Sequence, residues 1–393
     1  MKVVRKASAN SNIYTGIILI VSLAIAYIVW AARATAFRDF RVMYEGSRLI
    51  WEGRSSEAYD AVNFHQISDS TLPASLGELD VFISPPTFAV FLKPFTWLSP
   101  MTAILAWTLL GIGALIYSSR ILLLDHTHWV VALGLPLSVI NLSLGQTGFF
   151  ALALAASIHA MCVKDKQITA GLLAGLTILK PTLFLGLVIW WILDWKRWKV
   201  SIAVALTTGV LLIIPTITGG FQVWRDFFGA IETRSNLEQV TATQFTLPET
   251  IIRLFGHSTG TSYYALGIYI AIGFILMRAA LQRWPERTDV LSGAAVLISV
   301  FISPHILVYD SLILVVPFAV AVHNAVATKN RQAALAILVI SIPITSWPLE
   351  PLPTLNSRIA LSTFAMITAS WIWVRSIDSP PTEAHAPKEL EAV

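Results

Sequence analysis

The first residue that could do chemistry is a carboxylate just beyond the first apolar run of the chain. Asp39 stands in Arg38-Asp39-Phe40-Arg41, a few residues after that run ends. A carboxylate at a membrane surface beside apolar residues can have a raised pKa, which suits a general base that takes a proton from a hydroxyl. The alternative is an ion pair with Arg38 or Arg41, and position alone leaves both roles open.

Three polar residues, Asn141, Gln146 and Lys180, lie in otherwise apolar sequence. A lysine inside a membrane costs about 2.5 to 3.5 kcal/mol on insertion scales, so Lys180 should face a partner or a cavity. It could neutralise a phosphate there, or its side chain could extend to the interface because Pro181 breaks the helix. Gln146 follows Gly145 and could contact a polar ligand or form a polar turn between two short helices.

A third group of polar residues follows the apolar run 289–302. His305, Tyr309 and Asp310 belong to Ser303-Pro304-His305-Ile306-Leu307-Val308-Tyr309-Asp310. Tyr309 lies four residues after His305 and so shares a helix face with it, whereas Asp310 need not. His305 could assist a base or bind a phosphate, or it could be a solvated or capping residue at a helix start.

These polar residues are exceptions in a mostly apolar chain. Of its 393 residues, 55% are hydrophobic and 13% are charged, and the mean hydropathy is +0.69. A soluble domain would be about 25% charged, so an ordinary soluble enzyme, a disordered chain and a nucleic-acid binder are excluded. Cys162 is the one cysteine, which excludes an intramolecular disulfide. Phosphate-loop, dinucleotide and zinc-protease motifs are absent from the sequence, and we expect no metal and no cofactor.

Twelve apolar runs are candidate membrane crossings. They cover residues 13–32, 81–98, 101–124, 129–142, 147–163, 168–193, 200–217, 263–281, 289–302, 306–326, 333–347 and 359–374. At about 20 residues for a full crossing, the apolar content supports ten or eleven spans, and short or broken helices raise the number. We predict an all-α polytopic membrane protein with about 12 transmembrane helices, in a range of roughly 10 to 13.

The first run sets the sidedness. It precedes Ala34-Thr35-Ala36, which resembles a signal-peptidase site, but it is longer than the about 7 to 15 apolar residues of a signal peptide, so we expect an uncleaved helix. With the N-terminus inside, alternation puts the following segments inside: 1–12, 196–199, 278–287, 329–331 and 375 onward. They hold 13 of the 27 Lys and Arg residues, as the positive-inside rule requires. Both termini are then cytoplasmic.

Two long segments, 33–80 and 218–262, fall outside. The first carries eight carboxylates and five arginines, and we expect catalytic or binding work in this first external loop. The interrupted stretch 129–194 should line something polar, because helices broken at membrane depth are tolerated only beside protein or water. We predict a single transmembrane domain over 1–375 and a disordered cytoplasmic tail over 376–393.

Two motifs have an architectural explanation. Pro85-Pro86 suits a helix start, because proline has its backbone angle already set for the first helical position. Gly171 and Gly175 are four residues apart, which suits two closely packed helices.

The order of these motifs resembles glycosyltransferase family 87, in the GT-C superfamily of lipid-carrier-dependent enzymes. The matching residues are Asp39-Phe40 with Tyr44, Gly46, Gly53 and Tyr59-Asp60; Ser84-Pro85-Pro86 with Leu92-Lys93-Pro94; Gly145-Gln146; Ala170-Gly171-Leu172 to Lys180-Pro181; and Ser303-Pro304-His305 with Tyr309-Asp310. Their order and spacing together are more specific than any one motif.

The resemblance implies a GT-C fold and an enzyme that transfers a mannosyl or related glycosyl residue from a polyprenyl phosphate. The acceptor would be a lipid or a glycan, and the reaction would occur on the non-cytoplasmic face of a bacterial plasma (inner) membrane. The resemblance implies that Asp39 is the base and that His305 orients or supports it. Met43-Tyr44 stands where the family often has an aromatic doublet. The expected substrate-binding residues are Lys180, Gln146, Tyr44, Tyr309, Asp310 and Arg38.

These residues suit an inverting, metal-independent transfer. A phosphate-linked sugar already has a good leaving group, so one base, Asp39, can suffice. Lys180, His305 and an arginine of the first loop would stabilise the charge that develops on the departing phosphate. A retaining enzyme would usually need a second carboxylate as nucleophile, and none is evident.

Two other classes compete with this hypothesis. A transporter or lipid flippase could use Lys180, His305 and Asp310 as an intramembrane relay, which would predict repeat symmetry and functional residues near the midplane. A membrane polysaccharide ligase or polymerase would rely on arginines of an outside loop, for which the candidates are Arg225, Arg234 and Arg253. The expected partners are the lipid-linked donor, the acceptor and membrane lipids, without nucleic acid.

Overall fold

The computed structural model describes residues 37–71, 82–122, 136–237, 259–303 and 308–328. Every regular element in these ranges is a helix, and no strand occurs in them. The all-α prediction is confirmed for this part of the chain. The predicted crossings 13–32, 333–347 and 359–374, the tail 376–393 and His305 lie outside the described residues.

Among the described helices, three are long and apolar enough to cross a membrane. These are Pro100–Ile121, Trp195–Gly219 and Leu266–Arg283. They correspond to α6 (Pro100–Ile121), to η3 (Trp195–Arg197) with α12 (Trp198–Gly219), and to the larger part of α15 (Thr259–Arg283). Large apolar side chains on them are exposed, among them Leu109 on α6 and Leu206 on α12, as lipid contact requires. The chain is therefore a membrane protein, and the total of about 12 crossings stays a prediction.

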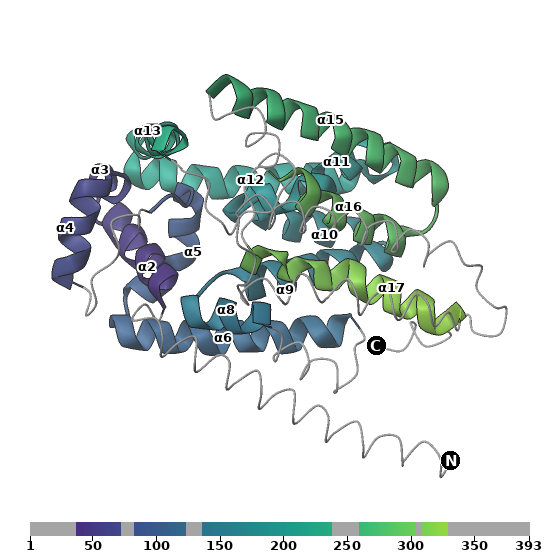
Figure 1. Cartoon of the computed structure of the whole chain (residues 1–393), viewed down its shortest axis with the longest axis horizontal. Coiled ribbons are helices and arrows are strands. Elements are labelled where there is room, and N and C mark those ends of the chain that lie inside the picture. The colour runs from purple at the N-terminus through teal and green to yellow at the C-terminus, as the bar shows by residue number, and fades with distance from the viewer. Residues whose placement is uncertain (1–36, 72–81, 123–135, 238–258, 304–307, 329–393) are drawn as a thin grey trace, which may run out of the picture.

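Shorter helices pack between the three long ones and run lengthwise with them (Figure 1). They are α8 (Pro136–Leu144), α9 (Gly148–Val163), α10 (Gln167–Gly175) with η1 (Leu176–Leu179), η2 (Pro181–Phe184) with α11 (Leu185–Leu193), α16 (Thr288–Ile302), and η4 (Val308–Leu314) with α17 (Val315–Thr328). Their shared core is built from buried side chains such as Leu152, Trp190 and Leu291.

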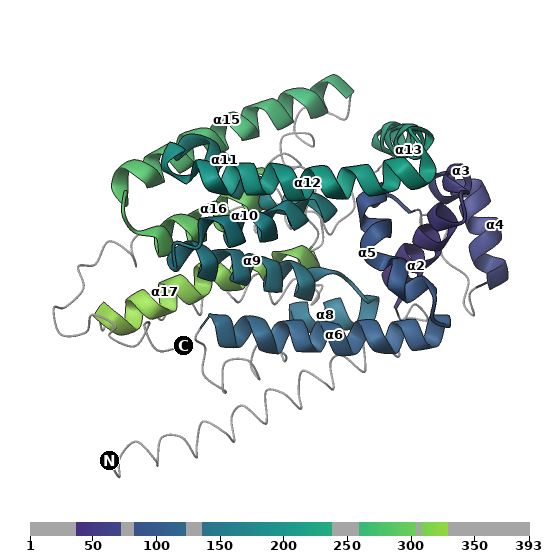
Figure 2. The ribbon, with the colours of Figure 1, turned by 180° about the vertical axis from the view of Figure 1, so that it is seen from behind.

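The remaining helices gather at one end of the bundle in both views (Figures 1 and 2). They are α2 (Arg38–Trp51), α3 (Ser55–Tyr59), α4 (Ala61–Thr71), α5 (Pro86–Thr96) and α13 (Gln222–Leu237). We call this the loop end, and the opposite end, with the connections 164–166, 194–197 and 284–287, the turn end. The described parts of the predicted external loops, 33–80 and 218–262, are therefore largely helical.

The apolar run 168–193 passes along the bundle twice, so its interpretation as one crossing is wrong. Arg197 bonds to Thr288 Oγ1 at 2.9 Å, so α12 and α16 start at the same, turn end. α10 runs parallel to α12, whereas α11 runs antiparallel to α16, because Gly186 N donates to Ser299 Oγ at 2.8 Å. The chain reverses at Lys180-Pro181, where proline cannot continue the preceding helix.

The close packing predicted for Gly171 and Gly175 is confirmed. A Cβ on Gly171 would lie 2.5 Å from the backbone oxygen of Val200, and one on Gly175 would lie 2.3 Å from Thr207 Cβ. Only glycine lets α10 approach α12 so closely.

The apolar run 81–98 does not cross the bundle, which corrects a second predicted crossing. Its helix α5 has 11 residues, which is about 16 Å. It begins at Pro86, as predicted, and both of its flanks contact the middle of α2: Phe82 packs against Gly46, and Leu98 O accepts a hydrogen bond from Tyr44 at 2.9 Å. Hydropathy could not distinguish this run, which is buried in protein, from one buried in lipid.

The two corrections change the number of crossings before residue 196 by equal and opposite amounts, so the predicted side of the later segments is unchanged. α6 starts at the loop end and runs parallel to α9, because Trp107 Nε1 donates to Gly145 O at 2.9 Å and Ser157 Oγ contacts the Tyr117 hydroxyl at 3.2 Å. One crossing is lost before α6 and one is gained at Lys180, so the segment 196–199 keeps its predicted side. The connection 164–166, with two lysines, moves to that same side.

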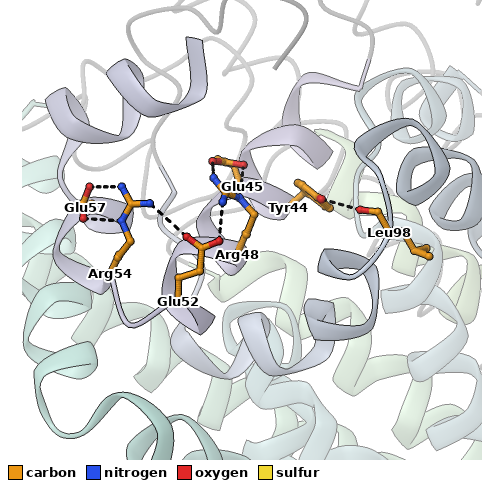
Figure 3. A network of polar contacts seen from close by, with 7 residues as sticks. All are labelled: Tyr44, Glu45, Arg48, Glu52, Arg54, Glu57 and Leu98. Atoms are coloured by element: carbon orange, nitrogen blue, oxygen red, sulfur yellow. Dashed lines mark hydrogen bonds and ion pairs between the residues drawn. The ribbon is translucent and has the colours of Figure 1, made fainter. Parts of the chain in front are cut away.

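Several charged side chains of the first external segment pair with one another across α2, α3 and the connection between them. Arg48 pairs with Glu45 and with Glu52, the latter at 2.6 Å, and Arg54 pairs with Glu52 at 3.3 Å and Glu57 at 2.7 Å (Figure 3). The hydrogen bonds that Arg48 donates to Glu45 raise the pKa of Arg48, and those that Arg54 donates to Glu57 lower the pKa of Glu57. These five side chains therefore form a continuous ion-pair network, which accounts for part of the charge that suggested binding work.

Candidate active site

Asp39 lies in the first turn of α2, where the helix dipole favours a carboxylate. The helix follows Phe37, which adopts a left-handed φ of 58°, uncommon for an aromatic residue. Phe37 N donates to Ser143 O at 2.7 Å, which ties the start of α2 to the end of α8. The Asp39 carboxylate is half-buried and accepts a hydrogen bond from the Gln146 amide.

Lys180 stands at the reversal between η1 and η2. Its ammonium forms an ion pair with Asp310 on η4 and lies 3.3 Å from Thr147 Oγ1. The Asp310 side chain is 1% exposed and that of Lys180 is 30% exposed, so a buried carboxylate meets a cation that still reaches solvent. The Lys180 ammonium also lies 5.4 Å from the ring centroid of Tyr309. The predicted need of Lys180 for a partner is confirmed.

Two consecutive residues connect the carboxylate of α2 with the lysine. Gln146 contacts Asp39, and the next residue, Thr147, contacts Lys180. Both residues are buried. Groups that are 141 positions apart in the sequence, at 39 and 180, are thereby brought to the same short turn before α9.

The turn itself is fixed from several sides. Gly145 has a φ of +69°, and a Cβ there would lie 2.5 Å from Phe40 Cβ, so the position requires glycine. Trp107 Nε1 donates to Gly145 O at 2.9 Å. Asn141 Oδ1 accepts from Gly148 N at 2.9 Å. The side chains of Gln146 and Thr147 are therefore presented in a defined orientation.

Asn141 also reaches the third part of the site. Its Nδ2 donates to the Tyr309 carbonyl at 3.0 Å, next to Asp310. One buried amide thus joins the end of α8, the start of α9 and η4. Asn141 stands out in the sequence as a polar residue among apolar ones, but nothing local assigns it a role. Thr147 was not among the predicted residues, and its hydroxyl directly after Gly145-Gln146 was the available signal.

The other predicted binding residues differ in whether their side chains lie beside the site or in the protein core. Arg38 is half-buried and adjoins Asp39 in α2, and Tyr309 is half-buried beside Lys180. Tyr44 is buried in an aromatic core with Phe40, and its hydroxyl donates to a backbone carbonyl, which favours a structural role. Burial raises the pKa of the Tyr44 hydroxyl, so it stays a neutral donor.

The described residues of the site combine a carboxylate with a cation and form no evident metal cradle. Within the residues that the structure describes, no group of three or more His, Cys, Asp or Glu side chains could hold a metal ion. Burial lowers the pKa of Arg41, two residues after Asp39 in α2. The arrangement can take a proton from a hydroxyl on one side of Gln146-Thr147 and stabilise an anion on the other.

These features define a helical membrane protein with a polar site at the loop end of its bundle. Comparison with protein families matches glycosyltransferase family 87 over residues 82–308, which is more than half of the chain. The chain therefore belongs to glycosyltransferase family 87 and is a membrane glycosyltransferase, and its helical architecture is consistent with the GT-C superfamily. Asp39 precedes the matched segment, and Asp310 follows it. No curated protein and no solved structure matches the chain.

Proposed function

We propose that this glycosyltransferase transfers a mannosyl, or closely related glycosyl, residue from a polyprenyl phosphate to a hydroxyl of a lipid or glycan acceptor. The observation that carries the proposal is the contact of Asp39 with Gln146 and of Lys180 with Thr147. It supports a reaction in which a hydroxyl is deprotonated close to where a phosphate departs. A donor with a long lipid chain suits a site among membrane helices.

Asp39 acts as the general base. Its carboxylate takes the proton of the acceptor hydroxyl while that oxygen bonds to the anomeric carbon of the sugar. The bond from this carbon to the phosphate oxygen breaks, and polyprenyl phosphate leaves with the electron pair. A single displacement inverts the anomeric centre. The Gln146 amide holds the carboxylate in orientation.

Lys180 stabilises the departing phosphate. An ammonium has three hydrogen-bond donors, and the contacts with Asp310 and Thr147 use two of them. The third donor is suited to a phosphate oxygen, since the side chain is partly exposed. Arg38, which follows Phe37 at the start of α2, and His305 are the further candidates for this role.

The reaction is proposed to take place on the non-cytoplasmic face of a bacterial plasma membrane, within a single domain over 1–375. The connections of the turn end include Lys164, Lys166, Lys196, Arg197 and Arg287. This basic set suits the cytoplasmic side. The candidate site lies toward the other end, where α2 to α5 and α13 gather (Figure 1).

A transfer assay in membranes tests the proposal. Vesicles that contain the wild type should move label from polyprenyl-phosphate mannose into an extractable glycolipid or glycan. Asp39→Asn should reduce the rate by about 100-fold or more, as expected for loss of a general base. Glu57→Gln, which changes a half-buried carboxylate of the neighbouring helix α3, should transfer at the wild-type rate.

The base, the donor sugar and the reaction type can each be contradicted by a different experimental result. Full transfer activity of Asp39→Asn would show that Asp39 is not the general base. Transfer from another polyprenyl-phosphate sugar, with none from the mannose donor, would change the sugar but keep the chemistry. Counterflow of an intact solute or lipid without bond cleavage would favour the transporter or flippase instead.

A further inference from the structure

α13 has three kinds of surface around its axis. Successive residues of a helix are about 100° apart, so residues three, seven and ten positions on return to nearly the same face. Phe221, just before the helix, with Trp224, Phe228 and Ile231 forms one such stripe. Val223 and Phe227 lie on a second face, where they are buried.

The first stripe is apolar and open. Phe221 is 75% exposed, Phe228 is 61% exposed and Ile231 is 43% exposed. Trp224 lies between them, and its ring centroid is 6.4 Å from that of Phe228. Scattered exposed apolar residues are common, but a row of large ones along a single helix face marks an interaction surface.

The second face holds the external helices in place. Phe227 packs against Tyr59 with ring centroids 5.7 Å apart, and Ser55 Oγ donates to Asp226 Oδ2 at 2.6 Å. Between this face and the apolar stripe lies a third, polar face with Gln222 and Arg225, both exposed. One face of α13 therefore packs against protein and another face is polar and exposed. The remaining face is apolar, and neither protein nor water suits it.

The direction of α13 indicates which environment that is. α12 runs along the bundle, whereas α13 is seen almost end-on in the same views, so the chain turns sharply away from the bundle direction between them (Figures 1 and 2). The bend falls at Gly220, which has a φ of +64°. α12 is a candidate membrane span that exposes Ile213 (55%) and Ile217 (77%) near its end, and Trp224 Nε1 of the stripe donates to Thr216 Oγ1 of α12 at 2.8 Å.

We propose that α13 lies in the plane of the membrane surface and that Phe221, Phe228 and Ile231 insert into the leaflet at the loop end. The occupant of the stripe is thus lipid, continuous with the lipid around α12. An interfacial helix of this kind buries its apolar face by about 5 to 10 Å and keeps its polar face in water. Through Ser55 and Tyr59 it also fixes the height of α3 above the lipid.

Depth measurements with a fluorescent label test this placement. Cysteine is introduced at Phe228 or, as the matched control on the polar face, at Gln222, and is labelled with an environment-sensitive nitrobenzoxadiazole dye. The native Cys162 is buried, and the protein without an added cysteine supplies the blank. The labelled protein is reconstituted into phosphatidylcholine and phosphatidylglycerol vesicles, with or without lipid that carries a nitroxide near the headgroup end of its acyl chain.

The dye at position 228 should emit at shorter wavelength than the dye at 222 and be quenched at least about twofold more by the nitroxide lipid. Phe221→Cys provides a second position on the apolar stripe if the 228 variant does not fold. Equal quenching at 228 and 222 would overturn the proposal. A blue-shifted dye at 228 that nitroxide lipid does not quench would also overturn it, because protein would then cover the stripe.

Discussion

Removal of the Lys180 ammonium should destabilise the protein more than removal of its partner carboxylate. In Lys180→Met, the Asp310 side chain, 1% exposed, loses its cation inside the bundle. A buried charge left in this way costs about 3 to 5 kcal/mol. In Asp310→Asn, the ammonium is 30% exposed and keeps Thr147 at 3.3 Å, so we expect a loss of only about 1 to 2 kcal/mol.

The double variant separates this explanation from a simple loss of packing. When both charges are removed, no buried carboxylate is left without the lysine ammonium, so Lys180→Met with Asp310→Asn should be more stable than Lys180→Met alone. The coupling energy should be about 1 to 3 kcal/mol. Unfolding of the purified protein in detergent, followed by tryptophan fluorescence, gives the four midpoints, and Lys199→Met at an exposed position controls for the loss of any lysine. Additive effects, or equal effects of the two single variants, would refute the reasoning.

Three further predictions follow from the site and its surroundings. Asn141→Ala should lower kcat by about tenfold at unchanged donor KM, because the turn before α9 loses a buried hydrogen-bonding side chain. Steady-state kinetics and the amount of folded protein are measured in the same membrane preparation. A reduced amount of folded protein with a normal kcat would contradict this prediction. Gly145→Ala should lower the unfolding midpoint and activity, because a Cβ there would lie 2.5 Å from another side-chain carbon, whereas Gly113→Ala, with open space, should do neither. Arg54 lowers the pKa of Glu57, so this pair stabilises the fold above the ordinary pKa of glutamate and loses that effect as the pH falls through the lowered value. Glu57→Gln should therefore reduce the fall in the unfolding midpoint between pH 7 and pH 3, and an unchanged fall would contradict it.

The sequence was informative where polar residues interrupt apolar ones. Lys180 in apolar surroundings required a partner, and Asp310 provides it. The break at Lys180-Pro181, the helix start at Pro86 and the close packing at Gly171 could also be predicted, since each follows from a local property of proline or glycine. The motif order was sufficient to identify the family.

The remaining features depend on tertiary contacts that hydropathy does not encode. The run 168–193 has a length that suits one tilted crossing, and only its neighbours α12 and α16 show that it folds back. Asp39 and Gln146 are 107 positions apart, and no local pattern predicts their contact. Tyr44 resembled a binding residue because aromatic side chains serve both cores and sites, and the structure places it in a core.

The most direct test of Asp39 as the base is to measure donor binding and transfer separately in one variant. Asp39→Asn is nearly isosteric, so it should bind the lipid-phosphate donor with the Kd of the wild type. In a single-turnover experiment at saturating donor, its transfer rate should fall by about 100-fold or more. A weakened Kd with an unchanged transfer rate would contradict the assignment, because Asp39 would then serve binding and another group would take the proton.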